Sequence, residues 1–287
     1  MSEDGARALS LIAFIGTEFS PWYAWSGRRD PANHVCLNVA MSGPGARFAM
    51  TDRGRGALGQ APGYLRLGAS SLRWDGAALR IEVDEVAGLP RPGRLRGTVR
   101  LVPAAVTGVE LPLTADGAHV WRPFAPAARI EVDLDVPGWR WTGHGYLDGN
   151  FGTRAMERDF LHWTWGRLAT PDGGALVVYD CALRDGGVRR AAMRFGPDGA
   201  ASHVEAPPVV PMGRTRWGLR REMRADPGTT PRALRSMLDA PFYARATVET
   251  TIGGERLHGV HEVIDLRRYS NPAIRPMIAF RVGRRRG

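Results

Sequence analysis

The chain has 287 residues, 44% of them hydrophobic, and a formal net charge of +10 at pH 7. This length and composition can fill one large or two ordinary hydrophobic cores, which excludes a disordered protein. The positive charge favours polyanionic partners, either nucleic acid or anionic lipid head groups.

The first predicted element is the apolar run at residues 8–15. It follows acidic residues and lacks the basic start and the cleavage site of a secretory signal. No apolar segment in the chain reaches the roughly 20 residues that a membrane-spanning helix needs. Cys36 and Cys181 lie far apart in no metal-ligand spacing, which predicts buried thiols in a reducing compartment. We therefore expect a cytoplasmic protein, soluble or peripherally bound to a membrane.

Strand patterns then dominate the chain. Polar and apolar residues alternate at 79–84, 129–135 and 245–250, which predicts strands with one wet face and one dry face. Turn signals separate such runs: Asp75-Gly76, Asp116-Gly117, Asp172-Gly173, Asp185-Gly186, Asp198-Gly199 and Gly253-Gly254. One short helix is predicted at 231–239, with Thr230 as N-cap and Pro231 at its first position.

These patterns predict an all-β chain of two lipocalin-like antiparallel barrel units with few short helices. A soft boundary near residue 137 divides it into an N-terminal domain, 1–137, and a C-terminal domain, 138–287. An elongated apolar cavity is expected inside. A barrel lined by aromatic residues can bind an apolar ligand without catalysis, and this alternative stays open.

Residues 139–167, WRWTGHGYLDGNFGTRAMERDFLHWTWGR, hold four of the nine tryptophans. Trp163 and Trp165 alternate along a predicted strand, where aromatic residues are usually core. Asp148 lies in a Tyr-Leu-Asp-Gly-Asn run that is typical of a turn, so the local pattern favours a structural role for it. His119 and His144 lack a histidine at i+2 or i+4, and no metal site is predicted.

Two motifs, GHGYLDGNFG at 143–152 and WTWGR at 163–167, resemble those of the carotenoid 1,2-hydratase family, also called hydroxyneurosporene synthases. The segments SLIAFIGTEFSPWYAW, HVCLNVAMSG, FAMTDRG and HVWRPFAP are similar to the same family, so the resemblance covers most of the chain. It implies a hydro-lyase that adds water to the terminal double bond of neurosporene or lycopene without a cofactor. The product is a 1-hydroxy carotenoid, reached through a tertiary carbocation.

Residues can be matched to that reaction. Protonating an unactivated alkene needs a neutral carboxylic acid in an apolar pocket, and Asp148 is the expected general acid. Aromatic faces stabilise a carbocation, a role that suits Trp121 and Tyr146. His119 is the candidate to hold and deprotonate the attacking water. In extended strands His119 shares a face with Trp121, and Tyr146 with Asp148, so both pairs can line one cavity.

Four further aromatic residues of this region are predicted to bind the substrate: Trp141, His144, Trp163 and Trp165. The expected partners are a linear carotenoid, water and an anionic membrane surface, with the protein on the inner, photosynthetic membrane. A basic tail of Arg281, Arg284, Arg285 and Arg286 favours that contact. Nucleic acid is not expected, because it would need exposed aromatic residues interleaved with arginine on one surface.

Overall fold

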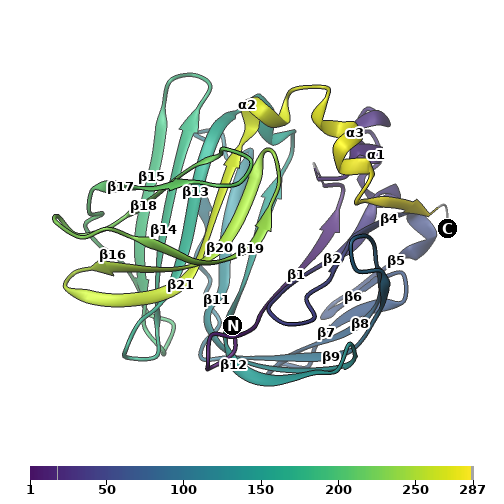
Figure 1. Ribbon diagram of the computed structural model, residues 1–287, viewed down its shortest axis with the longest axis horizontal. Helices are drawn as coiled ribbons and strands as arrows, with labels where there is room; N and C mark the ends of the chain where they lie inside the picture. The colour runs from purple at the N-terminus through teal and green to yellow at the C-terminus, as the bar shows by residue number, and fades with distance from the viewer. Residues whose placement is uncertain (18, 286–287) are drawn as a thin grey trace. The chain divides into compact units, whose positions relative to one another are not determined.

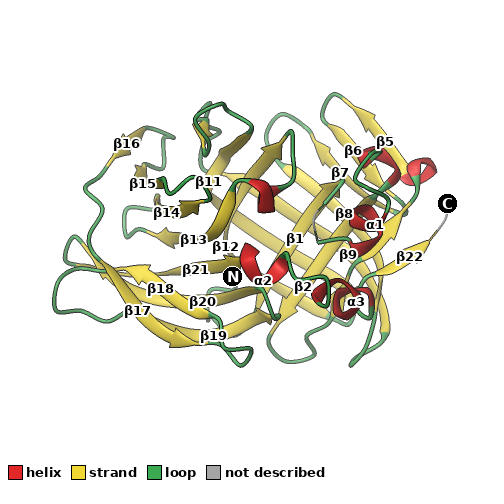
Figure 2. Cartoon of the chain, turned by 90° about the horizontal axis from the view of Figure 1, so that it is seen from above, coloured by secondary structure: helices red, strands yellow, loops and turns green. Residues whose placement is uncertain are grey.

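The computed structural model describes residues 1–17 and 19–285 and consists mainly of antiparallel strands, which confirms the all-β prediction (Figures 1 and 2). The helices are short: α1 (Pro21–Trp25), α2 (Leu266–Tyr269) and α3 (Ile274–Ala279), with the 3-10 turns η1 (Pro31–Asn33), η2 (Arg55–Ala57) and η3 (Met156–Arg158). None of the helices in this part of the chain combines the length and the hydrophobicity that crossing a bilayer requires.

The strands among the described residues form four sheets. The first contains β1 (Ala8–Ile15), β2 (Val35–Ser42), β3 (Phe48–Ala49), β4 (Thr51–Arg53) and β22 (Gly283–Arg285). The second contains β5 (Leu58–Ala61), β6 (Tyr64–Leu67), β7 (Ser70–Trp74), β8 (Leu79–Ala87), β9 (Gly93–Pro103), β10 (Leu111–Pro112), β11 (His119–Val136) and β12 (Trp139–Gly152).

The third sheet contains β13 (Phe160–Ala169), β14 (Ala175–Leu183), β15 (Val188–Phe195), β16 (Ala201–His203), β19 (Arg232–Asp239), β20 (Tyr243–Ile252) and β21 (Glu255–Asp265). The fourth is the hairpin of β17 (Val209–Arg214) and β18 (Arg220–Arg224).

The chain divides into two compact units. Unit 1 comprises Met1–Val102, Arg129–Gly145 and Pro272–Gly287, and unit 2 comprises Pro103–Ala128 and Tyr146–Asn271. Because β11 and β12 are long, each strand contributes residues to both units. The single boundary near residue 137 stays a prediction.

The seven-stranded sheet of unit 2 is open within the described residues, so the predicted closure into a barrel is not seen there. Its order is β16-β15-β14-β13-β21-β20-β19, and the two end strands do not pair with each other. One edge, β16, has only three residues, all exposed. The other edge, β19, is interrupted by two register shifts against β20. Short and bulged edges of this kind do not accept a further strand readily.

All six predicted turns lie between strands. The glycine of each has a positive φ, from 63° at Gly253 to 98° at Gly76. The helix predicted at 231–239 is wrong, because this segment is strand β19. Its backbone hydrogen bonds to β20 outweigh the helix preference of its alanine, leucine and methionine residues.

Strand β20 also differs from its prediction, since it is buried on both faces. Met223 of β18 belongs to the core that covers Ala246 and Val248 on one face. Arg245 and Thr247 on the other face are buried polar residues. The charged side chain of Arg245 therefore does not face solvent, whereas Glu249 of the same strand is half-buried. Cys36 and Cys181 are free and buried, as predicted, and burial raises the pKa of both thiols.

Candidate active site

One row of side chains crosses four strands of the seven-stranded sheet. Trp165 of β13 pairs with Tyr179 of β14 on one side and with Glu262 of β21 on the other, and Glu262 pairs with Arg245 of β20. The next row on the same face contains Trp163, which pairs with Cys181 and Ile264. We call this the inner face. Its side chains combine aromatic rings with one buried ion pair.

Strands β11 and β12 place three predicted site residues against the inner face. The Nε1–H of Trp121 donates to Oδ2 of Asp148 at 2.8 Å. The Trp121 ring packs edge-on against Tyr179, with the centroids 5.8 Å apart, and the Tyr146 ring packs against Trp165 at 5.1 Å. The structure thus brings Trp121, Tyr146 and Asp148 together. It also removes the turn interpretation of Asp148, which lies in extended β12.

Burial raises the pKa of Asp148 to about 6, although part of the residue is open to solvent. Desolvation is the largest cause, and the nearby Glu262 carboxylate adds to it. The hydrogen bond from Trp121 and the charge of Arg245 act in the opposite direction. Desolvation likewise raises the pKa of the Tyr146 hydroxyl, which stays neutral. The site therefore holds a carboxyl group that carries its proton more readily than an ordinary aspartate.

The ion pair beside this carboxyl group is itself buried. Nη2 of Arg245 bonds to Oε1 of Glu262, and the Tyr243 hydroxyl donates to Oε2 of Glu262 at 2.9 Å. Only 8% of the Arg245 side chain and 16% of the Glu262 side chain are exposed. Both oxygens of Glu262 thus have partners, and Arg245 compensates its negative charge.

Arg167 places a second guanidinium on the inner face, two residues from Trp165. Its Nε donates to the carbonyl of Pro126 in β11 at 2.7 Å, which ties β13 to β11. Desolvation lowers the pKa of Arg167 to about 10. Although Arg167 belongs to the Trp-Thr-Trp-Gly-Arg motif, this hydrogen bond gives it a structural role, which is to hold the two strands together.

His119 belongs to a neighbouring ionic chain. Its Nε2 lies 2.8 Å from Oδ2 of Asp159, and Asp159 accepts two hydrogen bonds from Arg154 at 2.7 and 2.8 Å. The His119 ring also packs against Phe160. A Cβ added at Gly152 would come within 2.9 Å of Nδ1 of His119, so glycine is needed there. Asp159 thus engages Nε2, and Nδ1 lies against Gly152.

The predicted substrate-binding residues are placed differently from one another. Trp163 and Trp165 are buried on the inner face, as the structural interpretation expected. The buried indole Nε1 of Trp165 has no hydrogen-bond partner within the described residues. Trp141 and His144 belong to unit 1, where Trp141 is half-buried and His144 is exposed. Substrate binding by all four stays a prediction.

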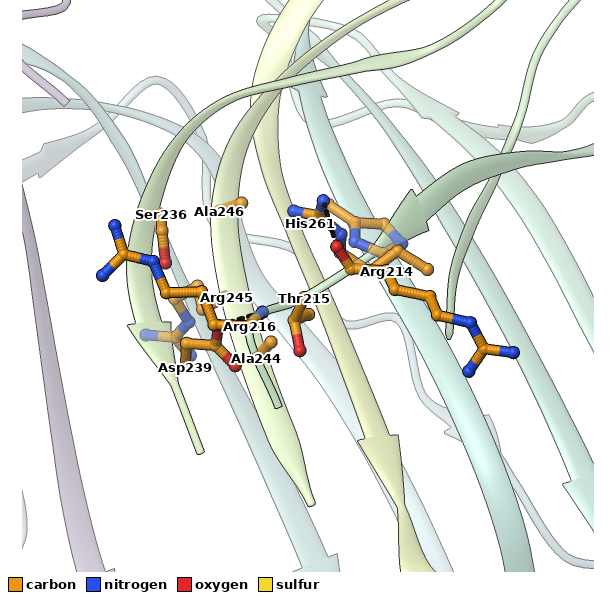
Figure 3. A pocket seen from close by; sticks show the side chains of 10 residues that line it. Arg214, Thr215, Arg216, Ser236, Asp239, Ala244, Arg245, Ala246 and His261 are labelled. Carbon is orange, nitrogen blue, oxygen red and sulfur yellow. Dashed lines mark hydrogen bonds between the residues drawn. The ribbon is translucent and has the colours of Figure 1, made fainter. Parts of the chain in front are cut away.

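One pocket of the structure is lined by other residues than Asp148, and the elongated cavity expected beside Asp148 stays a prediction. It measures about 170 Å³ and lies in unit 2 around the turn after β17 (Figure 3). It is lined by Arg214, Thr215, Arg216, Arg221, Ser236, Asp239, Ala244, Arg245, Ala246 and His261. Ala244, Ala246 and His261 alternate with the inner-face residues and so lie on the opposite face of the sheet.

Several residues of the inner face were not predicted from the sequence. Tyr179, Arg245 and Glu262 come from strands far from the aromatic segment, and only the sheet register brings them to Trp165. The sequence signal for them was weak, because both strands carry further charged residues, such as Glu249 in β20 and Glu255 in β21. No group of three or more metal-ligating side chains gathers among residues 1–17 and 19–285.

Comparison with known proteins gives a consistent result. Residues 11–287 match the family described as Carotenoid hydratase CrtC. The acyclic carotenoid 1,2-hydratase of Cereibacter sphaeroides is 53% identical, covering 96% of this chain and 99% of that protein. The enzyme of the same name from Rhodobacter capsulatus is 51% identical, covering 96% of this chain and 98% of that protein.

A solved structure from Nitrosomonas europaea, assigned provisionally as AttH, has a similar fold. Its TM-score is 0.60 at 13% identity, over 92% of this chain and 88% of that one. At this identity the likeness shows the fold alone, and it supports the lipocalin-like class of the β-structure.

Proposed function

Because the chain belongs to the carotenoid hydratase CrtC family, a family of hydro-lyases, we propose that it hydrates the terminal double bond of a linear carotenoid. Neurosporene and lycopene are the proposed substrates, and a 1-hydroxy carotenoid is the product. The single observation that carries the proposal is a carboxyl group, Asp148, with its pKa raised to about 6 among aromatic rings.

In the first step Asp148 protonates the less substituted carbon of the double bond. The Trp121 indole is a hydrogen-bond donor only, so Oδ2 of Asp148 must accept, and the acidic proton then lies on Oδ1. Trp121 thereby orients the acid toward the alkene. The new C–H bond uses the π electrons of the double bond, and the positive charge develops on the tertiary carbon.

In the second step the rings protect this cation. The faces of Trp121 and Tyr146 stabilise positive charge through their quadrupoles. The negative charge of Glu262 is already bound to Arg245 and Tyr243, so it does not compete as a nucleophile. Water then forms the C–O bond and loses a proton. His119, oriented by Asp159, is the proposed group that holds this water, and Asp148 recovers a proton for the next cycle.

Labelled water tests the proposal. Purified protein and lycopene in oxygen-free buffer containing ¹⁸O water are expected to give a hydroxylated carotenoid with one labelled oxygen per hydration. A non-catalytic binder of apolar ligands would bind lycopene and return it unlabelled. Mass spectrometry of the extracted pigment separates the two outcomes, and heat-denatured protein is the control.

A Trp121→Phe variant tests the orienting hydrogen bond. The bond from Trp121 lowers the pKa of Asp148, so its loss should raise that pKa above about 6. The alkaline fall of kcat/KM is then expected at higher pH than in the wild type, while the maximal rate drops. A purely structural Trp121 would lower the rate without moving the pH profile.

Peripheral binding to an anionic membrane is part of the proposal, because the substrate dissolves in lipid. The tail supports it only in part: Arg284 is bound to Asp52, and Arg286 lies outside the described residues. Better support comes from α1 and α3 of unit 1, which contact each other and expose Trp25, Met277 and Phe280. Phe280 is 92% exposed, as expected for a side chain that enters an apolar phase.

A further inference from the structure

The pocket around the turn after β17 is strongly cationic (Figure 3). Four of its ten lining residues are arginines, and Asp239 is the one acid among the ten. Arg245 is neutralised by Glu262. Within the described residues, none of Arg214, Arg216 and Arg221 forms an ion pair with a carboxylate. The pocket, which we call the arginine pocket, therefore carries uncompensated positive charge.

The lining contains buried polar atoms without a hydrogen-bond partner in the described part of the chain. Among them are Nε of Arg221, a donor, and Oδ1 of Asp239, an acceptor. Oδ2 of Asp239 is already used by the backbone N–H of Arg216 at 2.9 Å. Buried polar atoms are normally paired, so these two call for a ligand that offers both an acceptor and a donor. An anionic phosphate next to a hydroxyl group has that chemistry.

The pocket lies beside an exposed tryptophan. Trp217 is 49% exposed and follows the lining residue Arg216. Two hydrogen bonds hold its turn: the N–H of Gly218 donates to the carbonyl of Thr215 at 2.9 Å, and Nη1 of Arg268 donates to the carbonyl of Trp217 at 2.8 Å. A tryptophan held in solvent by a fixed turn is typical of residues that enter the interface of a lipid bilayer.

We propose that the arginine pocket binds the head group of an anionic glycerophospholipid such as phosphatidylglycerol. The phosphate lies against the arginines, a head-group hydroxyl donates to Asp239, and Trp217 enters the interface. A single exposed ring is a poor platform for single-stranded nucleic acid, which stacks successive bases on several aromatic residues. This binding is separate from hydration and is measured without a carotenoid.

The test compares three proteins on two probes. The probes are soluble glycerol phosphate, followed by calorimetry, and phosphatidylcholine vesicles with or without phosphatidylglycerol, followed by co-sedimentation. The pocket variant is Arg216→Gln/Arg221→Gln. The matched control is Arg189→Gln/Arg190→Gln on β15, which removes the same charge from exposed positions. The third protein is Trp217→Ala.

The pocket variant should lose glycerol phosphate binding, and its gain in vesicle binding from phosphatidylglycerol should fall roughly 25-fold, at roughly 5-fold per arginine. The control should keep both. Trp217→Ala should weaken vesicle binding and keep glycerol phosphate. If the pocket variant loses glycerol phosphate but keeps its vesicle binding, the ligand is a soluble phosphate and the lipid is wrong. Equal losses in the pocket variant and the control, or glycerol phosphate binding retained by the pocket variant, would also overturn the proposal.

Discussion

Asp148→Asn is expected to abolish hydration in a protein that still folds. The amide has nearly the same shape and still accepts the hydrogen bond from Trp121, but it has no proton acidic enough for a carbon–carbon double bond. Loss of a general acid usually costs about 10²- to 10⁴-fold in rate, and water is no substitute here at neutral pH. Turnover of lycopene and the thermal midpoint are measured on the same sample.

The matched control for this variant is Tyr146→Phe. It keeps the ring that packs against Trp165 and removes only the hydroxyl, so its rate should fall much less. Near-normal turnover in folded Asp148→Asn would show that another group delivers the proton. A lower midpoint with unchanged turnover would instead assign Asp148 a structural role.

Glu262→Gln is expected to have the largest effect on stability. Removing one charge of a buried pair leaves the other uncompensated, and such changes cost about 3–5 kcal/mol. For a chain of this size the thermal midpoint should fall by roughly 10 °C. The pKa of Asp148 should also fall, because the carboxylate that raises it is gone and Arg245 is left unneutralised. The alkaline limb of kcat/KM then moves to lower pH.

Two comparisons control this variant. Asp133→Asn removes one charge of the exposed Arg140–Asp133 pair and should change the midpoint little. Arg245→Met/Glu262→Leu removes both charges of the buried pair and should recover most of the lost stability. A Glu262→Gln protein as stable as Asp133→Asn would mean that the pair is effectively solvated.

Local signals predicted much of the fold. Alternation identified β8 over residues 79–84, and the six predicted turns lie between strands, because these features depend on neighbours in sequence. The turn interpretation of Asp148 failed, since β12 continues through Asp148 and Gly149. The helix at 231–239 failed since β19 is held by an edge contact with β20 that no local pattern encodes. The prediction that Arg245 faces solvent failed for the same reason, because its partner Glu262 lies on another strand.

The residues of the candidate site were likewise predicted only in part. Trp121, Tyr146 and Asp148 could be chosen from motifs and from the i, i+2 rule, and the structure joins them. The alignment of Glu262 and Tyr179 with Trp165 follows from the register of three strands. The engagement of His119 with Asp159 depends on a contact 40 residues apart in the chain. Neither follows from spacing alone.

A direct titration of the Asp148 carboxyl group tests the central claim. The difference between the infrared spectra of the wild type and of Asp148→Asn isolates the protonated carboxyl band of this one residue. The account predicts that the band disappears with a midpoint near pH 6, so that about one tenth of the molecules keep the proton at pH 7 before substrate excludes further water. A midpoint near the ordinary value of 3.8 would contradict it, because Asp148 would then be ionised where the enzyme has to donate a proton.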